Sequence, residues 1–177
     1  EGSLNEYMTR LLLAAYELTY EDIEKFGGKI TKAGLTVIQD LYQDNRIDMV
    51  VGITTPGHPN TAQLSIAPGQ KFLSLEEHAI EYLKGFGFMR AAMPANLFQG
   101  QDEEVIGVGF STGIYVTEKM SDETAYMLTD AIMSDQAALV DSINALSAWS
   151  REGSGVEEAF GVPIHPGARR YFSENAA

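Results

Sequence analysis

The pattern of apolar and polar positions divides the chain into amphipathic segments and short apolar runs. Apolar residues at spacings of three and four predict helices, whereas short apolar runs bounded by turn residues predict strands. The predicted helices cover 4–17, 19–26, 35–43, 61–66, 75–84, 122–133 and 135–149, and a last one opens at Pro166. The predicted strands cover 49–53, 71–75 and 105–117, the last as one long bent strand or as two. Residues 89–101 are expected to form an irregular connection.

Serine residues stand at the starts of three predicted helices. Ser3, Ser74 and Ser121 each occupy an N-cap position, where a hydroxyl oxygen accepts a bond from a free backbone N–H. Glu6 follows Ser3 by three residues, and Glu77 follows Ser74 by three, which is the spacing of a capping box. Such a cap stabilises its helix, but the same hydroxyl and N–H groups are also suited to holding a carboxylate.

The segment 46–63 has the clearest functional pattern. Its apolar run, 49–53, is typical of a fully buried strand in a parallel sheet, and it ends in a polar loop, 54–60, that leads into a helix. In open α/β sheets the carboxyl ends of the strands face the ligand crevice, where a helix N-terminus presents free N–H groups to an anion. The pattern therefore predicts either an anion-binding loop or an ordinary connection between a strand and a helix.

Composition narrows the class of protein. With 177 residues and 45% hydrophobic content, the chain is long enough for one large domain or two small ones with a real core. No apolar stretch reaches the ~20 residues of a membrane-spanning helix, so direct membrane insertion is not expected. The net charge of -13 argues against nucleic acid and anionic membranes as partners, but a helix terminus could still bind an anionic small ligand. The absence of cysteine excludes disulfides and thiolate chemistry.

The sequence lacks the usual motifs of enzyme chemistry. Residues 109–113 match the letters of the GxSxG nucleophile elbow, but they lie between two extended segments rather than before a helix. A P-loop, a GxGxxG after a strand and an HExxH spacing are all missing. His78 is expected on a solvated helix surface, and the ring of His165 is expected to bond to backbone groups in a structural turn. We therefore expect no catalytic residue, metal or cofactor, with an enzyme using His58 or His165 as the alternative.

The end of the chain resembles a known family. Residues 163–174 read PIHPGARRYFSE, which is similar to the Pro-Leu-His-Pro-Gly-Ala stretch, followed by Arg-Tyr-Tyr, of TAXI-type solute-binding proteins of TRAP transporters. Other segments resemble the family in the same order: the opening turn at 2–6, the strand entry at 46–48, the Gly-x-Pro loop at 57–59 and the returning strand at 100–116. Leu4 and Asn5 replace the usual Gly and Thr, a departure that bears on how closely a ligand carboxylate approaches the backbone.

The resemblance implies an α/β fold of the type II periplasmic-binding-protein class, in which the ligand lies between two lobes. It aligns the chain with the second half of such proteins, so that residues 1–103 form most of lobe two and residues 104–177 return to lobe one. It implies a periplasmic or otherwise extracytoplasmic protein that binds a small solute, such as glutamate or a dicarboxylate, for the transporter's membrane subunits. The implied ligand-binding residues are Ser3 and Asn5 in the first turn, and Thr54, Thr55, Gly57 and Asn60 in the second loop.

Two further expectations concern the state of the chain. Because it begins at Glu1 without a visible leader, we expect a processed product or a fragment. A fragment without its partner strands would expose an unpaired sheet edge or an apolar patch, which favours self-association. A ligand-sensing domain is a further functional alternative, and it would need an output domain.

Overall fold

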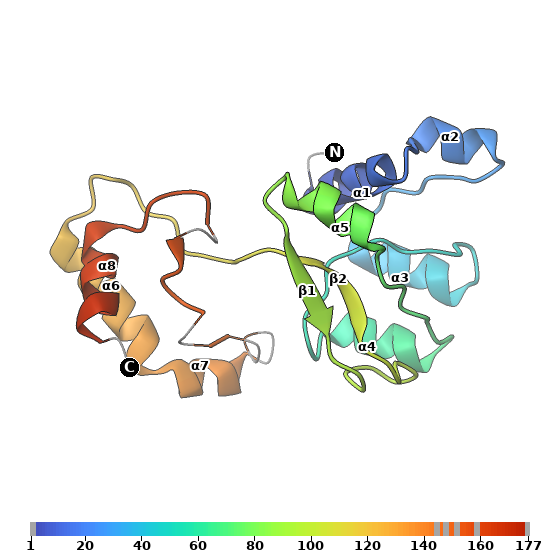
Figure 1. The fold of residues 1–177 in the computed structure, drawn as a ribbon. Helices are drawn as coiled ribbons and strands as arrows, with labels where there is room; N and C mark the ends of the chain where they lie inside the picture. Colours follow the sequence, from blue (N-terminus) through green and yellow to red (C-terminus); the bar gives the residue numbers. More distant parts are fainter. Residues whose placement is uncertain (1–2, 144–145, 147–148, 151–152, 158–159, 176–177) are drawn as a thin grey trace. The chain divides into compact units, whose positions relative to one another are not determined.

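The computed structural model describes residues 3–143, 146, 149–150, 153–157 and 160–175. The chain forms two compact units, Glu1–Gly109 and Phe110–Ala177 (Figure 1). The first unit contains α1 (Leu4–Ala15), α2 (Tyr20–Lys25), α3 (Leu35–Gln43), α4 (Pro59–Ile66), α5 (Glu77–Lys84), β1 (Met89–Met93) and β2 (Val105–Gly109). The second unit contains α6 (Asp122–Ser134), α7 (Gln136–Ser142) and α8 (Pro166–Glu174). The assignment of the predicted segments 1–103 and 104–177 to two lobes stays a prediction.

Most of the predicted helices are confirmed, and local capping signals fix the starts of several of them. The Ser3 hydroxyl accepts the N–H of Glu6 at 3.2 Å and begins α1, and the Ser121 hydroxyl accepts the N–H of Thr124 at 3.1 Å and begins α6. A complete capping box at Thr19 begins α2. The predicted helix 135–149 is shorter than expected, because α7 ends at Ser142. Part of the remaining predicted range lies outside the described residues. Gly2 of the predicted opening turn also lies outside them.

The predicted strands are mostly wrong. The described residues hold one two-stranded antiparallel sheet, in which Met89 of β1 lies opposite Gly109 of β2. The runs 49–53, 71–75 and 110–117 form no ladder, whereas part of the stretch predicted as irregular forms β1. A strand exists only with a partner, and periodicity in one segment does not show whether a partner is available. A parallel sheet is therefore not seen in the described part of the chain.

The segment 71–75 makes a single backbone contact with the sheet. The N–H of Leu75 donates to the carbonyl of Ile106 at 2.8 Å, and the N–H of Ile106 donates to the Ser74 hydroxyl at 3.0 Å. Ser74 therefore does not cap α5, contrary to the prediction. The N-cap of α5 is Glu76, because the serine hydroxyl is already bonded to β2.

The core of the first unit lies where α1, α5 and the sheet meet. Met8, Leu83 and Phe88 are its buried centre. Val51 and Val108 pack against this centre, which places the apolar run 49–53 beside the core although it forms no ladder. Burial of a large apolar side chain contributes about 1.5–3 kcal/mol, so this cluster positions the loop that follows the run.

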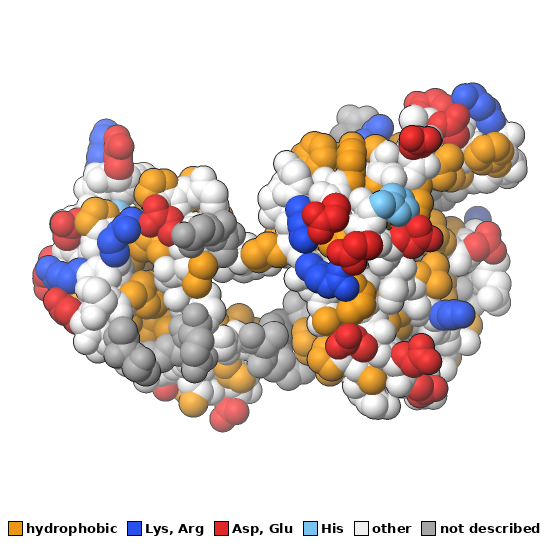
Figure 2. Space-filling model, in the orientation of Figure 1, with side chains coloured by type: hydrophobic (Ala, Val, Ile, Leu, Met, Phe, Trp, Pro, Cys, Tyr) orange, Lys and Arg blue, Asp and Glu red, His pale blue; other side chains and the backbone are white. Residues whose placement is uncertain are grey.

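Several apolar side chains of the predicted strands remain at the surface. Met49 and Leu73 are each 64% exposed in the first unit, and Ile114 and Tyr115 are 67% and 66% exposed in the second. Figure 2 shows hydrophobic side chains at the surface of both units. These four residues lie in extended segments without ladder partners, so both apolar side chains and backbone polar groups face outward there.

Candidate ligand-binding site

The loop 54–60 ends at the N-terminus of α4, as the sequence predicts. Pro59 is the first helical residue, and the first backbone bond runs from the N–H of Ala62 to the carbonyl of His58 at 3.0 Å. The His58 side chain does not cap the helix. Among the described residues, no acceptor is seen for the backbone N–H of Asn60 or Thr61. These two N–H groups are therefore available to an anion at the positive end of the helix dipole.

Thr54 ties the loop to the first turn of α4. Its hydroxyl oxygen lies 2.8 Å from the hydroxyl oxygen of Thr61. The carbonyl of Thr61 in turn accepts bonds from the Ser65 hydroxyl at 2.8 Å and from Nε2 of Gln70 at 2.9 Å. Ser65 is only 4% exposed, so these hydrogen bonds hold the buried side of α4 in place. They thereby fix the position of the loop 54–60 at the N-terminus of α4.

Two polar atoms of the loop are buried without a hydrogen-bond partner. They are Oγ1 of Thr55 and Nδ1 of His58. The turn between them is closed by a bond from the N–H of His58 to the carbonyl of Thr55 at 3.1 Å, with Gly57 at a φ of 70°. A buried polar group without a partner costs about 1–3 kcal/mol, so rotation of either side chain onto a ligand would recover that cost.

The first predicted turn lies at the start of α1. The Ser3 hydroxyl oxygen accepts the N–H of Glu6, so its own O–H remains a donor. The carbonyl of Asn5 accepts the Thr9 hydroxyl at 2.7 Å, and the Asn5 side chain is exposed. Lys32 and Arg10 both bond to the Glu6 carboxylate and lower its pKa, which keeps this carboxylate ionised in the first turn.

The six predicted residues thus form two groups. Ser3 and Asn5 lie at α1, and Thr54, Thr55, Gly57 and Asn60 lie at α4. No hydrogen bond between the two groups is seen among the described residues, and their convergence on one ligand stays a prediction. The sequence places His58 in the polar loop, before Pro59, but considers its side chain for a metal site or enzyme chemistry and not for ligand binding.

Two hollows of the described surface lie elsewhere. One, of about 500 Å³, is lined by residues including Lys71, Phe72, Gln101 and Glu103, and the other, of about 490 Å³, is lined by Glu157, Gly161, Val162 and Pro163. Neither is lined by any of the six predicted ligand residues. Within the described ranges, no group of three metal-ligating side chains is found.

The other two histidines have the structural roles that the sequence predicts. His78 is exposed on α5, with Nδ1 3.2 Å from the Glu76 carboxylate. His165 bonds to two backbone groups: Nε2 lies 3.1 Å from the carbonyl oxygen of Met120, and Nδ1 accepts the N–H of Gly167 at 3.2 Å. A ring with both nitrogens bonded to the backbone is a structural element, so nothing here arranges His165 as a base.

The sequence matches the NMT1-like family over residues 1–175. The chain belongs to the NMT1-like family. This is a periplasmic-binding-protein-like family of solute-binding proteins and not a family of enzymes, which agrees with a mixed helix and strand fold. A search of curated proteins finds no match. Among the described residues, none of the helices combines the length and the apolar character that crossing a membrane requires.

Proposed function

We propose that this NMT1-like protein captures a small carboxylate-bearing solute, such as glutamate or a dicarboxylate, for TRAP-type transport of the TAXI kind. The observation that carries the proposal is the loop 54–60, where two unpartnered buried polar atoms adjoin two free N–H groups at a helix N-terminus. The family supports the solute-binding part of the proposal. The TAXI resemblance of the C-terminal residues supports an extracytoplasmic location and the transporter's membrane subunits as partners.

In the proposed mechanism the ligand carboxylate binds at α4. The N–H groups of Asn60 and Thr61 donate to it, and the Thr55 hydroxyl rotates to add a third donor. The α4 dipole, equivalent to about half a positive charge at this end, offsets the repulsion of a chain whose net charge is -13. The Ser3 hydroxyl at α1, which belongs to the same predicted lobe, would hold a second polar group of the solute. Closure of the other lobe would then cover the solute.

Capture needs no covalent step. Donors that are fixed before binding cost little entropy to align, so their hydrogen bonds contribute directly to affinity. Thr54 supports this arrangement from behind, because its bond to Thr61 holds the loop against the helix. Gly57 supplies the positive φ that brings the loop back to α4.

Replacing Thr55 with valine separates binding from folding. Valine keeps the shape of the side chain but removes the unpartnered hydroxyl, so the free energy of unfolding is expected to stay unchanged or rise by about 1 kcal/mol. The affinity for the carboxylate solute is expected to fall about tenfold, because one donor is lost. Isothermal titration with L-glutamate and with succinate measures the affinity, and urea unfolding measures the stability.

Thr36→Val is the matched control, because Thr36 is exposed on α3 and its replacement should change neither quantity. If Thr55→Val bound these solutes as tightly as the unchanged protein, Thr55 would not contact the ligand. If neither solute bound the unchanged protein, the proposal of a carboxylate ligand would be wrong.

We also propose self-association through the unpaired extended segments. The runs 49–53 and 111–116 form no ladder in the described part of the chain and carry exposed apolar side chains, which favours edge-to-edge pairing. The expected result in sedimentation velocity is a concentration-dependent shift from monomer to dimer at micromolar protein. Ile114→Lys should weaken this shift, because lysine on an edge opposes pairing, whereas a monomer at every concentration would contradict the proposal.

A further inference from the structure

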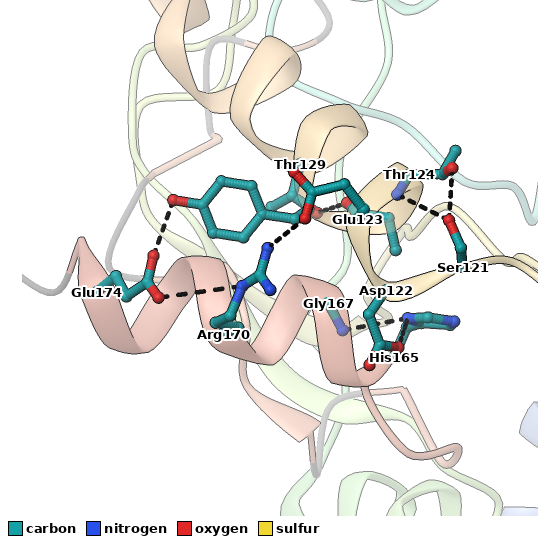
Figure 3. A network of polar contacts seen from close by, with 11 residues as sticks. Ser121, Asp122, Glu123, Thr124, Thr129, His165, Gly167, Arg170 and Glu174 are labelled. Carbon is teal, nitrogen blue, oxygen red and sulfur yellow. Dashed lines mark hydrogen bonds and ion pairs between the residues drawn. The ribbon is translucent and has the colours of Figure 1, made fainter.

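The ring of His165 joins the start of α8 to the turn before α6. Its Nε2 lies 3.1 Å from the carbonyl oxygen of Met120. Its Nδ1 faces the N–H of Gly167, as Figure 3 shows. A carbonyl accepts and an N–H donates, so Nε2 must carry a proton and Nδ1 must not. Only the neutral ring with its proton on Nε2 satisfies both contacts, and the side chain is only 12% exposed.

A second partner for Nδ1 lies close by. The carboxylate oxygen Oδ1 of Asp122 is 3.8 Å from Nδ1, outside hydrogen-bond distance. A protonated ring carries a proton on Nδ1 and no longer accepts the N–H of Gly167, because two donors would then face each other. The protonated ring would instead turn towards Asp122, which is 63% exposed and can move to meet it.

The charged residues next in sequence to the ring's partners lie on three segments of the chain. They are Lys119 in the turn that supplies the Met120 carbonyl, Asp122 and Glu123 at the start of α6, and Arg169 and Arg170 on α8. Glu123 and Arg170 bond to each other at 3.0 Å, and Arg169 bonds to Glu157 at 2.5 Å, so these groups are engaged elsewhere. Asp122 is thus the carboxylate placed to accept a hydrogen bond from the protonated ring.

We propose that His165 is a pH-sensitive latch. The neutral ring caps α8 by accepting the N–H of Gly167. The protonated ring releases this N–H and pairs with the Asp122 carboxylate instead. The latch acts at a tight contact between the two helices. Gly167 lies against the carbonyl of Asp122, where even a Cβ would not fit, so a change in the cap alters how α8 rests on α6. Acidification that protonates the ring would therefore loosen α8.

Nuclear magnetic resonance on the unchanged protein tests the two states directly. At pH 8 the ¹⁵N shifts of the His165 ring should show a proton on Nε2 and none on Nδ1. On acidification to pH 5, the Gly167 amide should exchange roughly fivefold faster than its intrinsic rate change explains, the factor that one net hydrogen bond represents. A proton on Nδ1 at pH 8, or a Gly167 amide whose protection is the same at both values, would overturn the latch.

A pair of variants separates the latch from general acid effects. The only tryptophan, Trp149, lies in the second unit, where its Nε1 donates to the Ser154 hydroxyl, so its fluorescence reports unfolding of that unit. The urea midpoint of the unchanged protein should fall from pH 8 to pH 5, and that of His165→Asn should stay level. His78→Asn should behave like the unchanged protein. An equal fall in His165→Asn would assign the effect to other groups and overturn the proposal.

Discussion

Replacing Gly167 with alanine should lower the free energy of unfolding of the second unit by about 3 kcal/mol, the upper range for overpacking a tight contact. Gly167 is buried in the first turn of α8, where this helix lies against the start of α6. A Cβ at this position would overlap the backbone carbonyl oxygen of Asp122 and lie 3.0 Å from the Cβ of Ala125. Backbone atoms cannot turn aside as a flexible side chain does, so α8 must move away from α6.

The displacement would also break the contacts that surround Gly167. Its N–H would leave Nδ1 of His165, and further along α8 the bonds from Arg170 to Glu123 and from the Tyr126 hydroxyl to Glu174 would lengthen (Figure 3). The bond to Glu123 raises the pKa of Arg170, and the bond to Glu174 raises the pKa of Tyr126. In both cases an ionised carboxylate favours the form that keeps its proton.

Urea unfolding followed by Trp149 fluorescence measures the loss. Gly52→Ala is the control, because a Cβ at Gly52 meets no atom within 4 Å and the residue has no positive φ, so its midpoint should not change. A Gly167→Ala variant with the midpoint of the unchanged protein would show that α8 does not rest on α6 in this way.

Replacing Gln101 with glutamate should lower the free energy of unfolding of the first unit by about 3 kcal/mol at pH 7, as for an unpaired buried charge. Gln101 is 4% exposed. Its Nε2 donates to the carbonyls of Met93 at 3.3 Å, Pro94 at 2.8 Å and Glu103 at 3.0 Å, which ties together the connection between β1 and β2. A carboxylate in this place has no proton to donate, and three carbonyl oxygens would face a negative charge.

The pH dependence of this loss identifies its cause. A protonated carboxyl group donates one hydrogen bond and carries no charge, so the loss should be smaller at pH 4 than at pH 7. Far-UV circular dichroism in urea follows the unfolding, and Gln43→Glu, at an exposed position of α3, should leave the midpoint nearly unchanged. If both variants had the same midpoint at pH 7, Gln101 would not hold the connection.

The sequence predicts the helices of this protein better than its strands, for a physical reason. A helix is closed by bonds between residues near in sequence, and the caps at Ser3, Thr19 and Ser121 can be seen in a few letters. A strand needs a partner that is distant in sequence. The run 49–53 has the apolar pattern of a buried strand, and its Val51 does pack against the core, but no ladder forms there among the described residues.

The candidate site is predictable in its position but not in its geometry. The polar loop before α4 follows from the sequence pattern, and the free N–H groups follow from the start of a helix at Pro59. His58 and His165 both precede a proline at a helix start, yet His165 caps its helix and His58 does not. Their surroundings decide the difference, because Met120 holds the ring of His165 in place, and this contact joins residues 45 positions apart.

Titration of the ¹⁵N-labelled protein with L-glutamate and with succinate tests the proposed solute-binding role most directly. Weak binding remains visible in amide chemical shifts, so the test does not require high affinity. The account predicts that the largest saturable shifts occur at the amides of Asn60 and Thr61 and in the loop 54–58, with smaller ones at Ser3 and Asn5. Amides in these segments that stay unmoved at millimolar solute, or shifts confined to other parts of the chain, would contradict a carboxylate site at α4.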